Sequence, residues 1–355
     1  MGAGYSIQID GAPDSQLGDA AELEVYERLG ATTTFRLTYA VDISGGDFPL
    51  LKDSRLAAGT IISIFVPDGS NTVCLVKGPI HAQRIHFEHG GEGSTIEVIG
   101  ADTSIVMDRE NKAVLWSDLT DSDAVSQIVG EYSLTPDVDT TTANHSEDKH
   151  VLVQRESDLT FVRRLARRNG FLFWITCDPT GSAETAHFKR PPVDDDPAHD
   201  LVINLDTPDS NIWTLDIEWD VERPTSVSAA QLDLNDKSTM DGSVSASPLN
   251  ALAANTLPDI VTDTRSLHLY APVDDAGDLQ ARGEGALIES NFFIRARGKT
   301  TNANLGGVLR APMVVNVRGI GSRHSGKWFC ESVRHSIDDV EHRMEFELIR
   351  NGWET

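Results

Sequence analysis

Residues 150–175 read HVLVQRESDLTFVRRLARRNGFLFWI, and this stretch predicts a capped helix that turns directly into a buried strand. Ser157 is a suitable N-cap, and Asp158 places a negative charge in the first turn, where the helix dipole favours it. Apolar residues recur at helical spacing and arginines occupy the opposite face: Phe161, Val162, Leu165 and Ala166 against Arg163, Arg164, Arg167 and Arg168. Asn169-Gly170 ends the helix, because glycine tolerates the left-handed conformation, and the apolar run 171–175 has the length of a strand.

The 355-residue chain is long enough for two or three domains, and its composition, 39% hydrophobic and 24% charged, is that of a globular protein. No apolar run approaches the ~18 residues of a membrane helix, so we expect no membrane partner. The opening residues MGAGYSIQIDGAPDS carry no signal-peptide pattern, and we expect assembly in the cytoplasm. Cys74, Cys177 and Cys330 lack zinc-ligand spacing and lie in apolar runs, so we expect buried free thiols.

The chain is strongly acidic, with a net charge of −25 and with 35 Asp, 20 Glu, 8 Lys and 22 Arg. This charge argues against nonspecific binding to nucleic acid or anionic membranes, and we expect no sequence-specific nucleic-acid partner. A surface rich in Asp and poor in Lys is typical of proteins that work in high salt, because screening relieves the self-repulsion. Two explanations of this composition are open: the protein comes from a halophilic source, or it is an acidic protein of a mesophilic particle.

Short strands separated by turn residues dominate both ends of the chain. Strands at 59–66 and 72–76 flank a turn, Gly78-Pro79 breaks the second strand, and 80–87 and 94–99 form another hairpin. The C-terminal strands 311–318, 327–335 and 343–349 repeat this order around a Gly-rich connection. We infer that the two ends are copies of one antiparallel β-barrel plan. Between them, 134–149 and 234–264 are polar and predict loops, whereas 275–290 predicts a helix.

Three separated segments resemble VgrG-type and phage late control D proteins, the central baseplate hubs of contractile tails and injection systems. The first is Glu156-Ser157-Asp158-Leu159 with Phe161, Arg164-Leu165 and Gly170 followed by aromatics; the second is Ile217-Glu218-Trp219 with Arg223-Pro224-Thr225; the third is Val317-Arg318-Gly319-Ile320-Gly321-Ser322-Arg323 with Ser325-Gly326-Lys327. The shared order of these segments carries the resemblance. The VgrG branch continues into an OB-fold and a β-helical spike, whereas this chain stops at Thr355, so we expect the spike to be a separate protein.

The resemblance implies a mainly β protein with helical insertions (α+β) and two tail-tube-like antiparallel β-barrels in one chain. The expected domains are a first barrel at 1–105, an insertion at 106–197 with helices near 122–130 and 157–169, a second barrel at 198–233 and 291–355, and a loop and helix insertion at 234–290. The residues expected to form the family motif and an interface are Glu156, Ser157, Asp158, Phe161, Arg163, Arg164, Arg167, Arg168, Gly170, Arg223, Gly319, Gly321 and Gly326.

Patterns that resemble catalytic, metal or cofactor sites are incomplete. His86-Phe87-Glu88-His89 is neither HExxH nor HxxEH, and Gly319-Ile320-Gly321 has no GK[ST] and no following helix. Ser325, His324 and His335 lack a GxSxG turn. We therefore expect no catalytic residue, no metal and no cofactor. The arginine face could bind nucleic acid or line a conduit, but pairing with acids of a neighbouring segment or subunit is favoured, because arginine suits interface ion pairs.

The predicted function is a structural baseplate hub, not an enzyme, in the virion tail or in the baseplate of an injection particle. Its homotrimer would join the sixfold tail tube to the threefold central spike, with the tail tube protein, the central spike protein and baseplate wedge proteins as partners. One alternative is a tail-associated cell-wall (peptidoglycan/glycan) hydrolase, which requires a catalytic constellation. A carbohydrate-binding β module is another, and it would need exposed aromatics in a chain that is only 6% aromatic.

Overall fold

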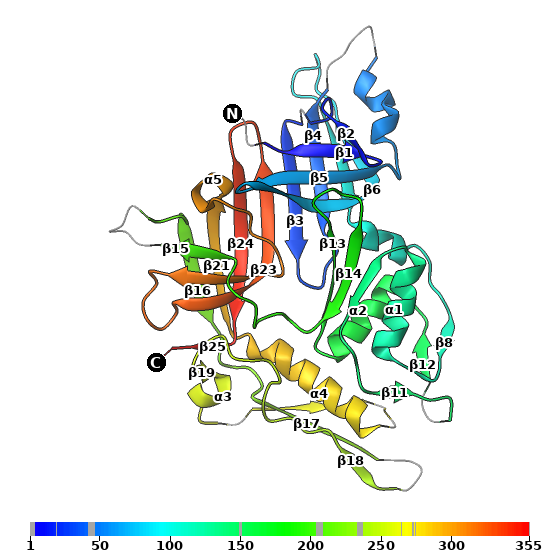
Figure 1. Ribbon diagram of the computed structural model, residues 1–355, viewed down its shortest axis with the longest axis vertical. Helices are drawn as coiled ribbons and strands as arrows, with labels where there is room; N and C mark the ends of the chain where they lie inside the picture. The colour runs from blue at the N-terminus through cyan, green and yellow to red at the C-terminus, as the bar shows by residue number, and fades with distance from the viewer. Residues whose placement is uncertain are drawn as a thin grey trace.

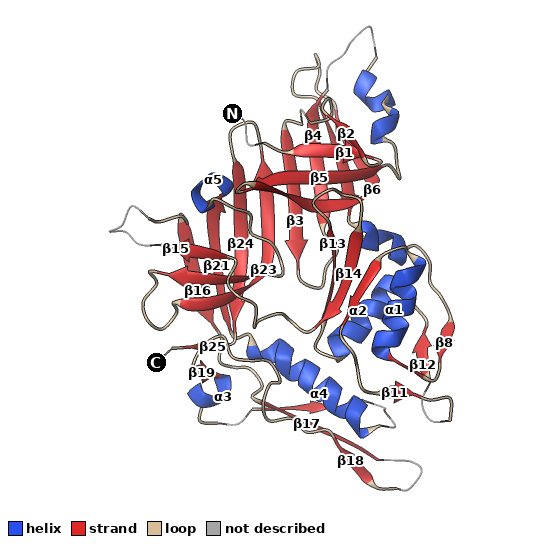
Figure 2. Ribbon diagram, in the orientation of Figure 1, coloured by secondary structure: helices blue, strands red, loops and turns tan. Residues whose placement is uncertain are grey.

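The computed structural model describes residues 4–18, 20–41, 47–148, 151–203, 209–232, 237–263, 265–271, 273 and 275–354. In these residues the protein is mainly β with a few helices, as Figure 1 and Figure 2 show. The strands are β1 (Ser6–Ile9), β2 (Ala12–Asp14), β3 (Glu22–Arg28), β4 (Thr34–Ala40), β5 (Ile61–Asp68), β6 (Asn71–His86), β7 (Thr95–Ala101), β8 (Val114–Trp116), β9 (Leu119–Thr120), β10 (Thr135–Val138), β11 (Asn144–His145), β12 (Leu152–Gln154), β13 (Leu172–Cys177), β14 (Glu184–Lys189), β15 (His199–Val202), β16 (Thr214–Trp219), β17 (Ser226–Leu232), β18 (Thr239–Asp241), β19 (Asn255–Thr256), β20 (Ser266–Leu269), β21 (Ile294–Thr301), β22 (Val314–Arg318), β23 (Gly326–Ile337), β24 (His342–Arg350) and β25 (Gly352–Trp353). The helices are α1 (Asp121–Glu131), α2 (Asp158–Arg168), α3 (Leu257–Ile260), α4 (Ala276–Asn291) and α5 (Asn302–Leu305), with 3-10 turns η1 (Pro49–Lys52), η2 (Ser54–Leu56) and η3 (Thr103–Asp108).

One large sheet organises the molecule and contains strands from both ends of the chain (Figure 2). Its order is β16-β21-β24-β23-β3-β4-β7-β6-β5-β1-β2, with β22 paired to β23 and β15 paired to β22. The neighbours are antiparallel except for β15 and β22, which run parallel. Buried side chains alternate along these strands, so one continuous core packs against both halves of the sheet.

The two halves repeat one pairing plan, in agreement with the duplication inferred from the sequence. The N-terminal half pairs β3-β4-β7-β6-β5, and the C-terminal half pairs β16-β21-β24-β23-β22 in the corresponding order. In each half one long strand pairs first with the strand before it and then with the strand after it, and a bulge interrupts this second pairing. The bulge lies between Ile80 and Ala82 in β6 and between Cys330 and Ser332 in β23. Cys74 and Cys330 occupy different positions in this plan, since Cys74 lies opposite β5 and Cys330 borders the bulge opposite β24.

The prediction of two β-barrels is not confirmed, because the described strands pair into one large sheet. No described strand pair closes either half on itself; instead, β3 pairs with β23, and this pair fuses the halves into a single sheet. The mainly β class with helical insertions is confirmed. The alternating sequence pattern specifies which face of a strand is buried, but it does not specify the strand that completes its edge.

The predicted break at Gly78-Pro79 is wrong, because β6 continues through it as one 16-residue strand. The dipeptide lies near the point where β6 exchanges β5 for β7 as its partner, with Pro79 still opposite Ile61. A proline is tolerated where a strand leaves a ladder, since its missing N–H is not needed there. Gly78 is required by close packing, because a Cβ at this position would lie 1.9 Å from the carbonyl oxygen of Ala101.

The segments predicted as loops contain short ordered elements. The stretch 134–149 contributes β10, which pairs in parallel with β14, and β11, which pairs with β9; its last residue lies outside the described residues. The described parts of 234–264 contain β18, β19 and α3. These elements are too short to show a hydrophobic period, and they depend on partners distant in the chain.

Two groups of helices lie beyond the ends of the strands of the large sheet, below it in the view of Figure 1. The first contains α1 and α2 with β13 and β14 around its own apolar core. The second contains α4, which packs on β17, and contacts between α2 and α4 join the two groups. None of the described helices combines the length and the apolarity that crossing a membrane requires.

The expectation of three free thiols is wrong for two of the cysteines. Cys74 of β6 and Cys177 of β13 form a disulfide, and Cys330 is a buried free thiol. The bond fastens the α1/α2 group to the N-terminal half of the sheet. The sequence held no signal for it, because the two cysteines are 103 residues apart.

Candidate functional site: the arginine face of helix α2

Helix α2 begins as its sequence predicts. The hydroxyl of Ser157 accepts a hydrogen bond from the Thr160 N–H at 3.3 Å. Asp158 is buried in the first turn, where it accepts a 2.6 Å hydrogen bond from the Tyr132 hydroxyl and lies 2.6 Å from Lys112 Nζ. Burial raises the pKa of the Asp158 carboxyl, but Lys112 and the hydrogen bonds outweigh it and lower the pKa below its usual value. Ser157 and Asp158 therefore have hydrogen-bond and ion-pair partners within the chain, and they stabilise the start of the helix.

The four arginines of α2 have different surroundings. Arg163 points to the N-terminal half of the sheet and donates to the Thr32 hydroxyl at 2.6 Å. Arg164 lies over the Phe161 ring and donates to Glu156 at 2.6 Å. Arg164 therefore has a partner within its own segment, whereas Arg163 connects the helix to the sheet.

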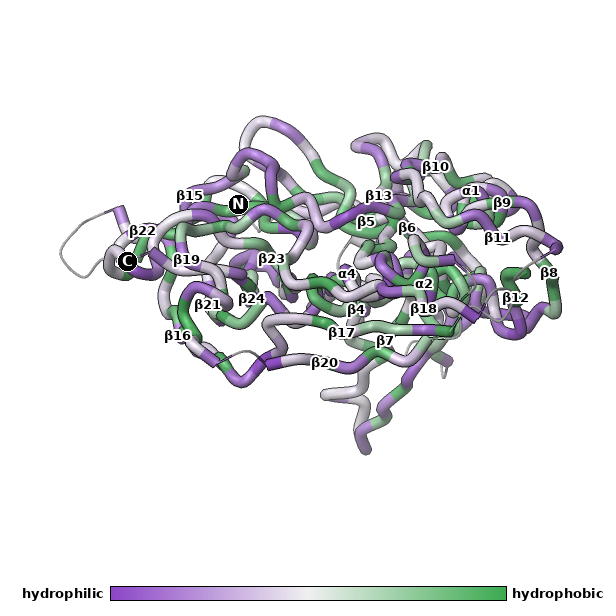
Figure 3. The backbone as a smooth tube through the Cα atoms, turned by 90° about the horizontal axis from the view of Figure 1, so that it is seen from below, coloured by the Kyte–Doolittle hydropathy of each residue, from purple (hydrophilic) through white to green (hydrophobic). Residues whose placement is uncertain are grey.

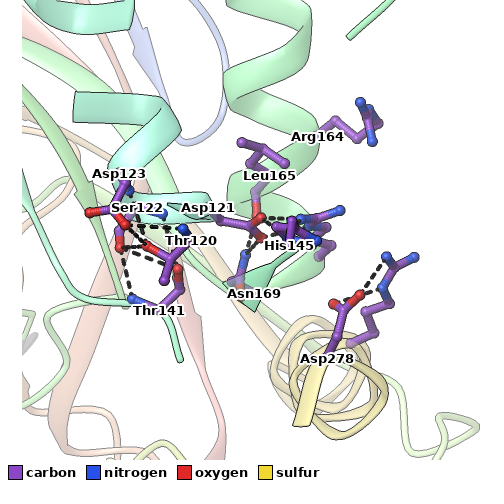
Figure 4. A network of polar contacts seen from close by, with 12 residues as sticks. Thr120, Asp121, Ser122, Asp123, Thr141, His145, Arg164, Leu165, Asn169 and Asp278 are labelled. Carbon is purple, nitrogen blue, oxygen red and sulfur yellow. Dashed lines mark hydrogen bonds and ion pairs between the residues drawn. The ribbon is translucent and has the colours of Figure 1, made fainter. Parts of the chain in front are cut away.

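Arg168 donates to Asp121, the first residue of α1. Figure 4 shows the polar network around Asp121, with His145 and Asn169 beside its carboxylate. The Asp121 carboxylate accepts hydrogen bonds from Arg168 Nε at 2.7 Å and Asn169 Nδ2 at 2.7 Å, and it lies 2.8 Å from His145 Nε2. Burial raises the pKa of Asp121, but His145, Arg168 and Asn169 outweigh it and lower the pKa to about 2. The network joins α1 to α2. Its carboxylate is ionised and held by Arg168, His145 and Asn169, so it offers no general acid and gives no support to the hydrolase alternative. In Figure 4, Arg164 lies apart from the network.

The C-terminus of α2 abuts α4. Gly170 has φ +67°, and a Cβ there would lie 2.6 Å from Ile288 Cδ1 and 2.9 Å from Gly285 Cα. Arg167 adds an exposed ion pair with Glu289 of α4 at 3.0 Å. Glycine is therefore required at 170 both for its backbone conformation and for the close approach of two helices.

A groove of about 880 Å³ lies between α2, α4 and β20. Its charged lining is Arg163, Arg164, Arg167, Arg168, Arg223, Arg282 and Glu289. Arg223, predicted from a separate motif, thus joins the α2 arginines, and Arg282 pairs with Asp278 at 2.9 Å. Arg282, Asp121, Glu289 and Gly285 were missed by the sequence analysis; the glycines at 283 and 285 inside a helix were the available signal of a close approach.

The remaining motif residues lie elsewhere. Gly319, Gly321 and Gly326 have φ of +85°, +80° and +121° at the turn between β22 and β23. A Cβ at Gly326 would lie 2.9 Å from the guanidinium of Arg350, which is buried and donates to the backbone oxygen of His324 at 2.9 Å. These glycines shape a turn of the C-terminal half and do not meet the arginine groove.

No group of three or more His, Cys, Asp or Glu side chains is arranged to hold a metal ion in the part of the chain that the structure describes. His86 Nε2 lies 2.9 Å from Glu88 Oε1 on an exposed hairpin. His335 and His342 form a buried pair, and burial lowers the pKa of both imidazoles, so that both are neutral at pH 7.

Comparison with known proteins gives a family and a fold. A family model described as the Alg8 N-terminal domain matches residues 3–339, and no curated protein sequence matches the chain. The tail protein of Neisseria meningitidis MC58 is 16% identical, with 99% of this chain and 98% of that chain covered at a TM-score of 0.69. The 43 kDa tail protein of prophage MuSo2 from Shewanella oneidensis is 14% identical, with 98% of each chain covered and a TM-score of 0.69.

The Escherichia coli c3393 protein, described as a component of the type VI secretion system, is 16% identical, with 97% of this chain and 76% of that chain covered at a TM-score of 0.59. The resemblance to tail and injection-system proteins is thus confirmed for the fold, over nearly the whole chain.

Proposed function

The chain belongs to the Alg8 N-terminal domain family, and from the fold that it shares with tail proteins we propose that it is a structural protein of a phage tail or contractile injection system. Its role is that of a homotrimeric baseplate hub without catalytic activity, located in the tail or baseplate of the particle. It joins a sixfold tail tube protein to a threefold central spike protein and is surrounded by baseplate wedge proteins.

The observation that carries this proposal is the repeat of one pairing plan. Matching the bulge of β6 to that of β23 makes Ile80 equivalent to Cys330. Following the registers across the sheet makes Val25 of β3 equivalent to Ile217 of β16. The two halves are thus two copies of one tube-like unit, arranged side by side.

The junction between the halves provides a template for a junction between copies. β3 pairs antiparallel with the end of β23, with Val25 opposite His335 and Leu23 opposite Ile337. The equivalent strands are β16 and the end of β6, and neither has a described partner on the corresponding side. Unpaired edges of this kind are templates for pairing with a strand of another chain.

Transferring the register places Ile217 of one copy opposite Ile85 of the next, and Leu215 opposite Phe87. Ile85 is 46% exposed and Phe87 54% exposed, whereas their equivalents His335 and Ile337 are buried. The junction would cover these apolar side chains. Three copies then form a ring with six equivalent junctions, three within chains and three between them, which adapts threefold to sixfold symmetry.

The motif residues of α2 have a positioning role in this proposal. Arg163, Arg167 and Gly170 hold the α1/α2 group against the sheet and α4 within one chain. The sheet edges, rather than the arginine face, form the contacts between hub subunits.

The test is cross-linking of the full chain, combined with light scattering at low and at multimolar salt. Ile85→Cys with Ile217→Cys should give trimers joined by disulfides, because directly opposed Cβ atoms of antiparallel strands lie ~4.5–5.5 Å apart. Ile85→Cys with Asp216→Cys is the matched control, since residue 216 faces the other side of the sheet.

A threefold mass with selective cross-linking of the first pair supports the hub. Equal cross-linking of both pairs would exclude this register. A monomer at all salt concentrations, without cross-links, would exclude self-assembly of the chain through these edges.

A further inference from the structure

We propose that the groove between α2, α4 and β20 binds an extended acidic segment of another polypeptide, which adds a strand to the free edge of β20 and sets its carboxylates against the arginines. This site is separate from the sheet edges of the proposed hub and does not depend on the hub function.

The charge of the groove is opposite to that of the whole molecule. Six arginines and one glutamate line it, in a chain with a net charge of −25. Clustered arginines of this kind recognise carboxylates, because the planar guanidinium donates two parallel hydrogen bonds to them. The groove therefore favours a ligand with several carboxylates.

Three of the six arginines retain free capacity for donation, whereas Arg164, Arg168 and Arg282 are paired with carboxylates of their own chain. Arg167 is 77% exposed and pairs only with Glu289, itself 62% exposed; such a pair contributes little and exchanges readily for a ligand carboxylate. The Nε atoms of Arg163 and Arg223 are buried and have no hydrogen-bond partner among the described residues. Arg223 Nε lies 3.7 Å from Asp220, beyond hydrogen-bond distance. Buried donors without partners are costly, so a ligand acceptor that reaches them adds to the binding free energy.

The third wall of the groove is a sheet edge. β20 pairs in parallel with β17, and no strand among the described residues pairs with its other side. In Figure 3, β20 and β17 lie along the same side of α4. Leu267 of β20 lies beside Val227, whose strand is covered by α4, so it faces the groove, and Tyr270 just beyond the strand is 87% exposed.

These features together define the ligand. A segment added to β20 would use backbone hydrogen bonds for affinity and alternate side chains for specificity. Since successive side chains of a strand point to opposite faces, every second residue would face the arginines of α2. The expected segment therefore has acidic residues at alternate positions, with apolar or β-branched residues between them that promote the extended conformation.

A nucleic acid fits the groove less well. Its backbone carries a negative charge at each phosphate. Phosphates that extend past the groove would meet the acidic surface of a chain with net charge −25, which repels them. The lining offers one aromatic side chain, Tyr270, where a single strand requires a row of stacking platforms. A short peptide carries fewer charges and supplies backbone groups that match the edge of β20.

The test is fluorescence anisotropy of the full chain with a labelled ten-residue peptide that alternates glutamate and valine. We expect saturable binding that weakens with salt. Arg164→Gln with Arg167→Gln should weaken it about tenfold, which corresponds to about 1.4 kcal/mol for the two exposed contacts together. Tyr270→Ser should also weaken it, and Arg343→Gln, an exposed arginine on the β23–β24 hairpin, should leave it unchanged.

Three probes separate the alternatives. A peptide with alternate amides N-methylated keeps its charge but cannot pair as a strand; equal binding would exclude strand addition. A lysine–valine peptide should not bind. Tighter binding of a ten-nucleotide oligo-dT would assign the groove to nucleic acid, and no binding of the glutamate–valine peptide by the folded chain would overturn the proposal.

Discussion

At the residue scale, the buried carboxylate of Asp121 couples α1 to α2, and its ionisation should govern part of the acid stability. Its pKa of about 2 lies below the ordinary 3.8, so its stabilising contribution is complete above pH ~4 and is lost as the pH falls towards 2. Asp121→Asn leaves the buried Arg168 without a counter-charge and should lower the free energy of unfolding at pH 7 by about 3 kcal/mol.

Urea unfolding at pH 7 and at pH 3 measures this effect. The difference between wild type and Asp121→Asn should narrow at pH 3. The double variant Asp121→Asn/Arg168→Gln should lose less than the sum of the single variants, because the second change removes the uncompensated charge. An unchanged difference at pH 3 would contradict the assigned ionisation.

Gly170 offers a second residue-scale prediction with a matched control. Gly306 has a similar backbone, φ +71°, and a Cβ added there would meet no atom within 4 Å, whereas a Cβ at Gly170 would be crowded by Ile288 and Gly285. Gly306→Ala should cost about 1 kcal/mol for the left-handed conformation alone. Gly170→Ala should cost a further 1–3 kcal/mol, roughly, for overpacking between α2 and α4. Equal losses in chemical denaturation would show that the two helices can separate without cost.

At the scale of elements, the Cys74–Cys177 bond ties β13 to β6. It closes a loop of about a hundred residues, so the chain-entropy model predicts that Cys74→Ser/Cys177→Ser lowers the free energy of unfolding by about 5 kcal/mol. Thiol titration in denaturant should count one free thiol before reduction and three after it. Reductant should destabilise the wild type and leave the double variant unchanged; three thiols before reduction would show that the bond is absent in solution.

The elements also show how a local signal is overridden. Gly78-Pro79 ends a strand in most contexts, yet β6 continues because it leaves β5 and joins β7 near this point. Helix α2, in contrast, follows its own sequence from Ser157 to Asn169, since its cap, its apolar stripe and its stop lie within one short segment.

At the scale of the whole molecule, the excess of 55 acidic over 30 basic residues should make stability depend on salt. Screening weakens repulsion among exposed acids, so the urea midpoint should rise between low salt and about 2 M KCl. The variant Asp195→Asn/Asp196→Asn removes two exposed acids and should show a higher midpoint at low salt with a smaller rise. A midpoint that falls with KCl would contradict both this account and the prediction of a halophilic source, which otherwise stays a prediction.

The mainly β class, the caps of α2, the helix at α4 and the repeated strand pattern could be predicted from the sequence, because each depends on residues that are close in the chain. Only the tertiary structure decided that β3 joins β23, that Cys74 meets Cys177, and that Arg223 and Arg282 meet the arginines of α2 around one groove. These depend on pairs from separate parts of the chain, and the residue types involved allow many partners. Which edges, thiols and charges meet is fixed by the packing of the elements as a whole, and that packing leaves no period or motif in the sequence.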